Sequence, residues 1–127
     1  MRILIDTHIL IWYLDGNDKL SDKLYYQLND VQNDVFISIV SLWEIAIKMN
    51  IGKLSLSQSL IEIQDYLTSK EFILLEVKFT HLNTLSTLPL HHKDPFDRLL
   101  IAQAIAENLT LISADQHFQA YAVNLLQ

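Results

Sequence analysis

Short apolar runs alternate with longer amphipathic segments along the whole chain, and this alternation narrows the possible folds more than any other feature. Ile3-Leu4-Ile5 and Thr110-Leu111-Ile112 are runs of the first kind, whereas the segment from Asp94 to Glu107 carries apolar residues at helical spacing. Strands of a parallel sheet are covered on both faces, so they appear as continuous apolar runs. The alternation therefore predicts βα units around a parallel sheet.

The pattern predicts element positions to within a few residues. Strands are expected over residues 3–5, 35–37, 72–77, 110–112 and 122–125. Helices are expected over residues 7–14, 21–29, 57–69, 80–86 and 94–107, and over a segment that begins at Ser38 or Ser41 and ends near Gly52. Ser21 and the two alternative serines are suitable N-caps, and a glycine suits a helix C-terminus.

This order predicts a three-layer α/β/α sandwich around a central, mostly parallel five-stranded sheet. We interpret residues 1–127 as a single domain, because a second core would not fit. Half of the residues are hydrophobic and 19% are charged, which excludes a disordered segment. No stretch suits a membrane helix, and Asp6 comes too early for a signal peptide. Because the chain also lacks cysteine, we expect a cytoplasmic protein with no membrane partner.

The charge balance limits how the chain can contact nucleic acid. It has 9 Lys and Arg against 15 Asp and Glu, a formal net charge of −6. A broad basic surface is therefore excluded, and direct DNA binding is not expected. A nuclease is not excluded, because two divalent ions would add +4 to the −6 and leave the chain near −2.

Four acids are expected at one edge of the predicted sheet. Asp6 directly follows the first strand, and Asp115 follows the strand at 110–112. Glu44 and Asp97 lie in early turns of helices that begin at the same edge, because strand-to-helix connections start where strands end. Carboxylate ligands suit Mg²⁺ or Mn²⁺. The sequence thus predicts an acidic metal pocket that can activate water and neutralise charge on a phosphodiester.

Each acid taken alone also has a purely structural explanation. An aspartate that ends a strand, such as Asp6 or Asp115, often only forms a turn or a cap. Glu44 stands four residues before Lys48 and can form a helical ion pair, although its apolar neighbours place it at the border of a buried face. Asp97 falls in the first turn of its helix, where an acid contributes to capping. The four acids are informative as a set rather than singly.

Four motifs in a fixed order resemble a known family. They are Ile5-Asp6-Thr7-His8, Ser38-Ile39-Val40-Ser41-Leu42-Trp43-Glu44-Ile45, Asp94-Pro95-Phe96-Asp97-Arg98 and Ile112-Ser113-Ala114-Asp115. The chain resembles the PIN domain family, in particular VapC-type toxins of the subgroup with an Asp-Pro-Phe-Asp-Arg motif. The resemblance extends over essentially the whole chain. Its most specific part is Asp-Pro-Phe-Asp-Arg followed by Leu-Leu-Ile-Ala-Gln-Ala.

The resemblance implies a parallel sheet between helices and a pocket for one or two Mg²⁺ or Mn²⁺ ions. It implies that Asp6 and Asp97 are the main metal ligands and that Glu44 and Asp115 complete the pocket directly or through water. The resemblance implies that Thr7, Ser38 and Ser41 support the metal ligands. Helix capping is the alternative role for the two serines. The implied reaction is endonucleolytic cleavage of RNA by water activated at the cations. Without cations, crowding of like charges should raise the carboxylate pKa values.

The resemblance also implies partners. VapC-type toxins are usually homodimers, inhibited by an antitoxin whose segment enters the active-site groove with a basic side chain near the acids. We therefore expect a homodimer, an RNA substrate and an antitoxin partner. Two alternatives within the family stay open: a housekeeping PIN nuclease without an antitoxin, and a catalytically silent PIN domain that serves as an interaction module.

Several cationic residues near the predicted edge have competing interpretations. Arg98, His92 and Lys93 are candidate contacts to RNA phosphates, and a polar surface loop is the alternative for the last two. His81 and His117 fit the surface of a helix without a functional role.

Three aromatic residues are further candidates for RNA contacts, and two other fold families can be compared with the sequence. Trp12, Trp43 and Phe96 can stack on nucleobases, but core packing explains each as well. A haloacid-dehalogenase-like phosphatase needs a second aspartate two residues after Asp6, where this chain has His8. A receiver-like module needs an acidic pair near the first strand and a lysine after the last one, and the chain lacks that pattern.

Overall fold

A computed structural model describes all 127 residues of the chain. Its sheet has five strands in the order β3-β2-β1-β4-β5, and every neighbouring pair is parallel. The strands are β1 (Arg2–Ile5), β2 (Asp34–Ser38), β3 (Ile73–Leu75), β4 (Thr110–Ile112) and β5 (Leu125–Leu126). The predicted fold class is confirmed.

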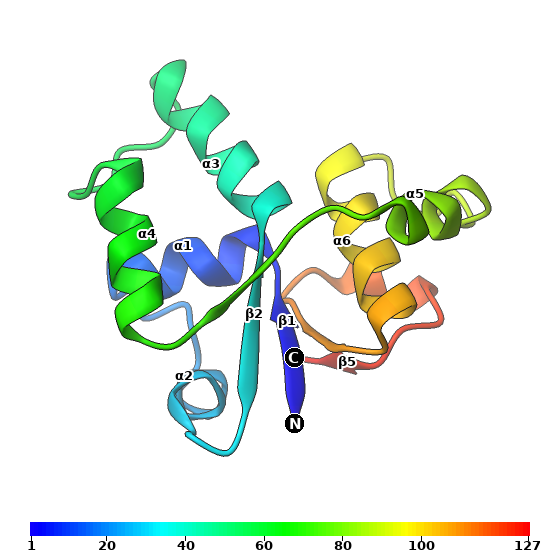
Figure 1. The fold of residues 1–127 in the computed structure, drawn as a ribbon, viewed down its shortest axis with the longest axis horizontal. Coiled ribbons are helices and arrows are strands. Elements are labelled where there is room, and N and C mark those ends of the chain that lie inside the picture. Colours follow the sequence, from blue (N-terminus) through cyan, green and yellow to red (C-terminus); the bar gives the residue numbers. More distant parts are fainter.

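Helices lie on both sides of the sheet in Figure 1, with α1 to α4 on one side and α5 and α6 on the other. The helices are α1 (Thr7–Asp15), α2 (Asp22–Asn29), α3 (Ile39–Asn50), α4 (Leu60–Ser69), α5 (Phe79–Ser86) and α6 (Pro95–Glu107), with a 3-10 helix η1 (Gln116–Ala120). All of them are too short or too polar to cross a membrane.

The core is divided into two clusters because side chains of a strand point alternately to opposite faces. Ile3 and Ile5 join the cluster formed with α1 to α4, whereas Leu4 joins Ile101 of α6 and Phe118 of η1 on the other face. Residues 3–5 are fully buried, as expected for a central parallel strand. β1 therefore holds both helical layers together.

Polar side chains begin the helices at the positions that the sequence indicates. Ser21 accepts a hydrogen bond at the start of α2, and Asp94 accepts two at the start of α6. Ser38 rather than Ser41 caps α3, because Ser41 already lies inside the helix. Gly16 ends α1 in the left-handed conformation at φ 63°, which glycine adopts without steric cost.

Two predicted boundaries were wrong. The helix expected from residue 57 begins at Leu60, because Ser59 and Glu62 form a capping box that fixes the first turn there. The last strand is β5, later than the predicted 122–125, because residues 121–124 form an irregular connection between η1 and the strand. The sequence analysis did not predict η1. A single 3-10 turn lacks the apolar periodicity that identifies longer helices.

Candidate metal centre

The acids lie near the point between β1 and β4 where the order of the parallel strands reverses. β1 and β4 are neighbours, but α1 leaves β1 toward one face and η1 follows β4 on the other. In open parallel sheets such a switch point forms a crevice beyond the strand ends. Asp6 follows β1 and donates its N–H to the Ile112 carbonyl at 3.0 Å, so the ends of β1 and β4 are held together. Asp115 caps η1 just beyond β4.

Asp6 is almost fully buried and is held by hydrogen bonds on both carboxylate oxygens. Its Oδ1 accepts from the Ile9 N–H at 2.9 Å, which caps α1, and its Oδ2 accepts from Ser113 Oγ at 2.6 Å. Burial raises the pKa of Asp6 above its usual range, even though the bonds from Ser113 and Ile9 lower it. The two hydrogen bonds therefore fix the orientation of the Asp6 carboxylate, while burial disfavours its charged form.

The charges of the other three acids act on Asp97, but no three of the four carboxylates offer oxygens within 4.8 Å of one another. Burial is the largest cause that raises the pKa of Asp97 to about 8, followed by repulsion from Asp94, Asp6, Glu44 and Asp115. The helix cap contributes to this environment, because Asp94 accepts the Asp97 N–H at 3.1 Å. The predicted rise in pKa is thus present at Asp6 and Asp97. A positive ion would relieve the repulsion that causes part of it.

Glu44 has a carboxylate oxygen that no group in the protein satisfies. The residue is 5% exposed, and its Oε2 accepts from Lys48 Nζ at 2.7 Å. Its other oxygen, Oε1, is the one buried side-chain polar atom of the structure without a hydrogen-bond partner. Leaving a buried acceptor unpaired costs about 1–3 kcal/mol. The helical ion pair that the sequence predicted therefore exists, but it uses only half of the carboxylate.

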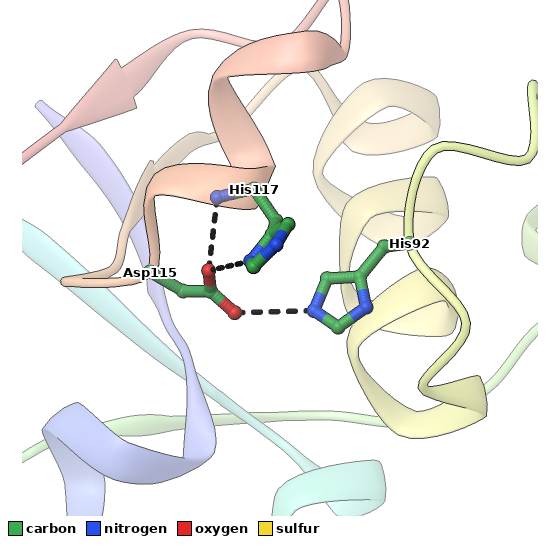
Figure 2. Close-up of side chains that lie close together, drawn as sticks. All are labelled: His92, Asp115 and His117. Atoms are coloured by element: carbon green, nitrogen blue, oxygen red, sulfur yellow. Dashed lines mark hydrogen bonds and ion pairs between the residues drawn. The ribbon is translucent and has the colours of Figure 1, made fainter.

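Asp115 differs from the other acids because two histidines contact it (Figure 2). His92 Nε2 lies 3.1 Å from Asp115 Oδ2, and His117 donates its backbone N–H to Oδ1 at 2.9 Å and has its Nδ1 2.8 Å away. Burial alone would raise the pKa of Asp115, but these bonds from His117 and His92 lower it overall. The expectation of a raised carboxylate pKa was therefore wrong for Asp115.

His92 links two of the acids. Its Nε2 lies 3.1 Å from Asp97 Oδ2 as well as 3.1 Å from Asp115 Oδ2. Its Nδ1 accepts the Asp94 N–H at 3.2 Å, so the ring proton resides on Nε2. His92, Asp115 and His117 place ligand atoms within 4.8 Å of one another, but a protonated Nε2 has no lone pair for a metal. His92 is thus a hydrogen-bond donor to the acids.

Arg98, predicted to contact phosphate, is turned toward its own loop. Its Nη1 donates to the Pro89 carbonyl at 2.9 Å and to Tyr121 Oη at 3.2 Å, and its Nη2 donates to the Leu88 carbonyl at 3.3 Å. The guanidinium therefore fastens the segment that leads to His92. Lys93 is exposed on that same segment.

The predicted supporting hydroxyls connect helices rather than carboxylates. Thr7 Oγ1 donates to Ser41 Oγ at 3.0 Å, which ties α1 to α3. Ser38 Oγ donates to Gln103 Oε1 at 2.6 Å, which ties the start of α3 to α6. These bonds fix the helices that carry the acids relative to one another.

Two residues are placed differently from the sequence prediction. His81 was assigned to a helix surface but is fully buried, because α5 packs against α6 and the ring reaches Glu107 Oε1 at 3.2 Å. Trp43 was assigned to the core but is 58% exposed, and its ring packs edge-to-face on Phe96 with centroids 5.0 Å apart. Trp12 and Phe96 are partly buried.

Sequence reasoning missed three residues that shape the site. Ser113 lies directly after β4, and a small polar residue at that strand end was a local signal for it. Gln103 lies inside α6, where a buried amide on an otherwise apolar face could have been noticed. Tyr121 carries no local signal, because its contact with Arg98 joins residues separated by 23 positions.

The donor set fits a hard divalent cation. Asp6, Glu44, Asp97 and Asp115 offer oxygen ligands only, the kind that Mg²⁺ and Mn²⁺ prefer. A positive ion would give Glu44 Oε1 a partner. The same ion would relieve the repulsion that the other acids exert on Asp97. The residues present are therefore suited to such an ion.

Several solved structures have a similar fold. The VapBC2 structure from Rickettsia felis, bound to a promoter DNA fragment, matches with TM-score 0.76 and 20% identity over 99% of this chain and 98% of that chain. A toxin-antitoxin complex from Klebsiella pneumoniae matches with TM-score 0.67 and 19% identity over 98% and 96%. VapBC-1 from nontypeable Haemophilus influenzae matches with TM-score 0.66 and 17% identity over 100% and 98%. At these identities the likeness shows a shared fold.

Sequence comparison assigns the family independently of that likeness. No curated protein sequence matches the chain. The PIN domain model, in contrast, matches residues 3–124, which include all four acids and every strand except the last. The chain therefore belongs to the PIN domain family.

Proposed function

We propose that the protein is an endoribonuclease that depends on Mg²⁺ or Mn²⁺ and acts as the toxin of a toxin–antitoxin pair. The observation that supports the proposal is the position of four acids around the switch point, one of them, Glu44, with a buried and unpartnered oxygen. Membership of the PIN domain family supports the same chemistry. A phosphodiester is a suitable substrate because the carboxylates and their cation favour transfer at an anionic phosphorus.

Each acid has a defined place in this proposal. Asp6 and Asp97 hold the cation, and Glu44 and Asp115 complete the pocket. When bound, a divalent cation neutralises charge on the phosphodiester and lowers the pKa of nearby water. Ser113 keeps the Asp6 carboxylate oriented through its 2.6 Å hydrogen bond.

Two protein groups act on the pocket without belonging to the ligand set. His92 donates between Asp97 and Asp115 and so fixes their spacing. Lys48 holds one oxygen of Glu44 at 2.7 Å and leaves the other free. Correct placement of reacting groups is itself a large part of catalysis, so both residues contribute by positioning.

Cleavage of structured RNAs by the purified protein tests the proposal. Asp6→Asn and Asp97→Asn should each lower the rate by more than about 100-fold, since even outer-shell partners of metal ligands are worth about 10- to 100-fold. Asp65→Asn is the matched control, because this carboxylate is exposed on α4. Equal cleavage by the wild type and Asp97→Asn would sink the proposal. So would cleavage that persists after chelation of divalent ions.

We propose an antitoxin partner for the same protein. The similar solved structures from Klebsiella pneumoniae and Haemophilus influenzae are a toxin-antitoxin complex and a VapBC-1 complex. On this chain, a groove between α3 and α4 is lined mostly by apolar residues, among them Leu42, Leu60 and the 71% exposed Ile61. An apolar helix suits such a groove, and a basic side chain suits the acidic pocket.

Expression in bacterial cells tests this partner. The wild-type chain should arrest growth, Asp97→Asn should not, and the product of a small adjacent gene should relieve the arrest. Ile61→Asp should weaken that relief while RNA cleavage by the purified protein stays unchanged. If the protein cleaves RNA but no adjacent gene product relieves the growth arrest, the protein is a housekeeping PIN nuclease instead. We also propose that the protein is a homodimer, which light scattering checks directly.

A further inference from the structure

The chain has only two tryptophans, Trp12 and Trp43, and each is close to two of the four acids in space or in sequence. Trp12 lines a pocket together with Asp6, His8, Ala114 and Asp115. Its indole ring lies 6.3 Å from the exposed imidazole of His8, at an interplanar angle of 52°. Two acids and two aromatic rings thus share one concave surface. A planar ring that enters this pocket would lie against Trp12.

Trp43 is the sequence neighbour of Glu44, one of the other two acids. It immediately precedes Glu44 on α3, and Phe96, on which it packs, immediately precedes Asp97 on α6. The two rings meet edge-to-face at 68°, a geometry that aromatic pairs prefer. Trp43 is 58% exposed, although its neighbours on the helix, Glu44 and Ile45, are buried. The exposed Trp43 ring thus lies where α3 and α6 meet, beside the chain segments that carry Glu44 and Asp97.

Two of the three cationic side chains near the pocket are already engaged within the protein, and Lys93 alone is exposed. Lys48 is engaged by Glu44 at 2.7 Å, and the Arg98 guanidinium is engaged by loop carbonyls. The chain as a whole carries a net charge of −6. Affinity from phosphate neutralisation is consequently weak, and stacking on aromatic rings is the other main source of affinity for single strands.

We infer that Trp12 and Trp43 are two base-stacking positions for single-stranded RNA, one beside Asp6 and Asp115 and the other beside Glu44 and Asp97. This inference rests on the proposed ribonuclease function and names the form of its substrate. Stacking requires unpaired bases, because the base faces inside a duplex are already covered. The strand would place one base on each tryptophan and the intervening phosphate over the acids.

Tryptophan fluorescence tests the inference directly, because the protein has no other tryptophan. Binding is measured with an RNA oligonucleotide of about eight nucleotides, within the usual range for one site. The measurement uses the Asp97→Asn variant, so that the RNA is not cleaved while binding is measured. The single strand should quench the emission, whereas the same sequence in a duplex should not. Trp12→Phe and Trp43→Phe leave one reporter each, and both variants should still be quenched.

Trp43→Ala should weaken binding of the single strand by about 5- to 150-fold, since stacking of one base is worth about 1–3 kcal/mol. Phe79→Ala is the matched control and should leave binding unchanged. Phe79 is a more exposed aromatic residue, at 82%. It lies next to Lys78, which contacts Glu107 at the end of α6 opposite Asp97. Circular dichroism verifies that each variant is folded.

The outcomes separate this inference from the proposed function. RNA cleavage by the wild type without quenching, or with equal quenching by the duplex, overturns the inference and leaves the ribonuclease proposal standing. Quenching by the single strand without cleavage supports the inference and removes the ribonuclease proposal. If Trp43→Ala disrupts self-association or antitoxin binding but not RNA affinity, the aromatic pair is a protein contact and the inference is overturned.

Discussion

Arg98 donates a hydrogen bond from Nη1 to the phenol oxygen of Tyr121 across 3.2 Å, joining the first turns of α6 to the residue that follows η1. The same phenol oxygen accepts the backbone N–H groups of His91 at 2.9 Å and His92 at 2.8 Å. Tyr121 and Arg98 thereby hold the backbone from which the His92 ring reaches Asp97 and Asp115. The spacing of two acids depends on a contact outside the pocket.

Tyr121→Phe removes that acceptor while it keeps the ring. We expect the backbone N–H groups of His91 and His92 to lose their partner, at a cost of about 1–3 kcal/mol in the free energy of unfolding. RNA cleavage should fall by about 10-fold, within the range for loss of a residue that orients a metal ligand. Denaturant unfolding and kcat measure the two effects. Tyr26→Phe, an exposed tyrosine on α2, should change neither; an equal loss in both variants would contradict the role of Tyr121.

Arg98→Lys distinguishes a contact with RNA phosphate from a contact with the loop. A lysine keeps the positive charge but not the planar fork that reaches the Pro89 and Leu88 carbonyls and Tyr121 together. We therefore expect Arg98→Lys to lose nearly as much activity as Arg98→Ala, mainly in kcat. If lysine preserved kcat and alanine raised KM, Arg98 would be the phosphate contact that the sequence suggested.

The pKa of Asp97 predicts how stability changes with pH in the absence of divalent ions. Its carboxyl has a pKa of about 8 in the folded protein against the ordinary value of 3.8. Between about pH 4 and pH 8 the folded state therefore holds a proton that the unfolded chain releases, so the free energy of unfolding should fall as pH rises through this window. Asp6 contributes with the same sign, because its pKa is also raised.

Thermal unfolding from pH 4 to 9 measures this slope. Asp97→Asn should flatten it, the Asp6→Asn and Asp97→Asn double variant should flatten it further, and Asp65→Asn should leave it as in the wild type. Added Mn²⁺ at pH 7.5 should raise the Tm of the wild type more than that of Asp97→Asn, since a bound ion stabilises by mass action. A wild-type Tm that rises steadily between pH 5 and 8 would contradict the expected sign.

Most of the helices and strands were predictable because the local spacing of apolar residues identifies them. Ile3-Leu4-Ile5 is buried on both faces and its apolar run reports that directly, and Asp94 followed by Pro95 marks the start of α6 through simple capping chemistry. η1 was not predictable, because its short turn depends on Asp115 as a cap and on Phe118 packing under α6. Tertiary contacts decide such segments.

The candidate site divides in the same way. Asp6 and Asp115 follow strands, so topology alone brings them to one edge. The contact of His92 with Asp115, the hydrogen bond between Arg98 and Tyr121 and the burial of His81 all arise from pairs far apart in sequence. Exposure of Trp43 was unpredictable for a related reason. Only the packing of α3 against α6 determines which part of α3 remains uncovered.

Glu44→Gln tests whether the unpartnered oxygen serves a cation. A glutamine keeps the shape of the side chain and still offers Lys48 an acceptor, but it removes the charge that raises the pKa of Asp97. Without divalent ions the variant should therefore unfold at the same temperature as the wild type or slightly higher. Its affinity for Mn²⁺ should fall by at least about 10-fold, the lower end for loss of even an outer-shell partner. Isothermal titration measures the affinity, and Glu62→Gln on the exposed start of α4 is the control. Unchanged Mn²⁺ affinity together with a lower Tm would identify Glu44 as a structural partner of Lys48 alone.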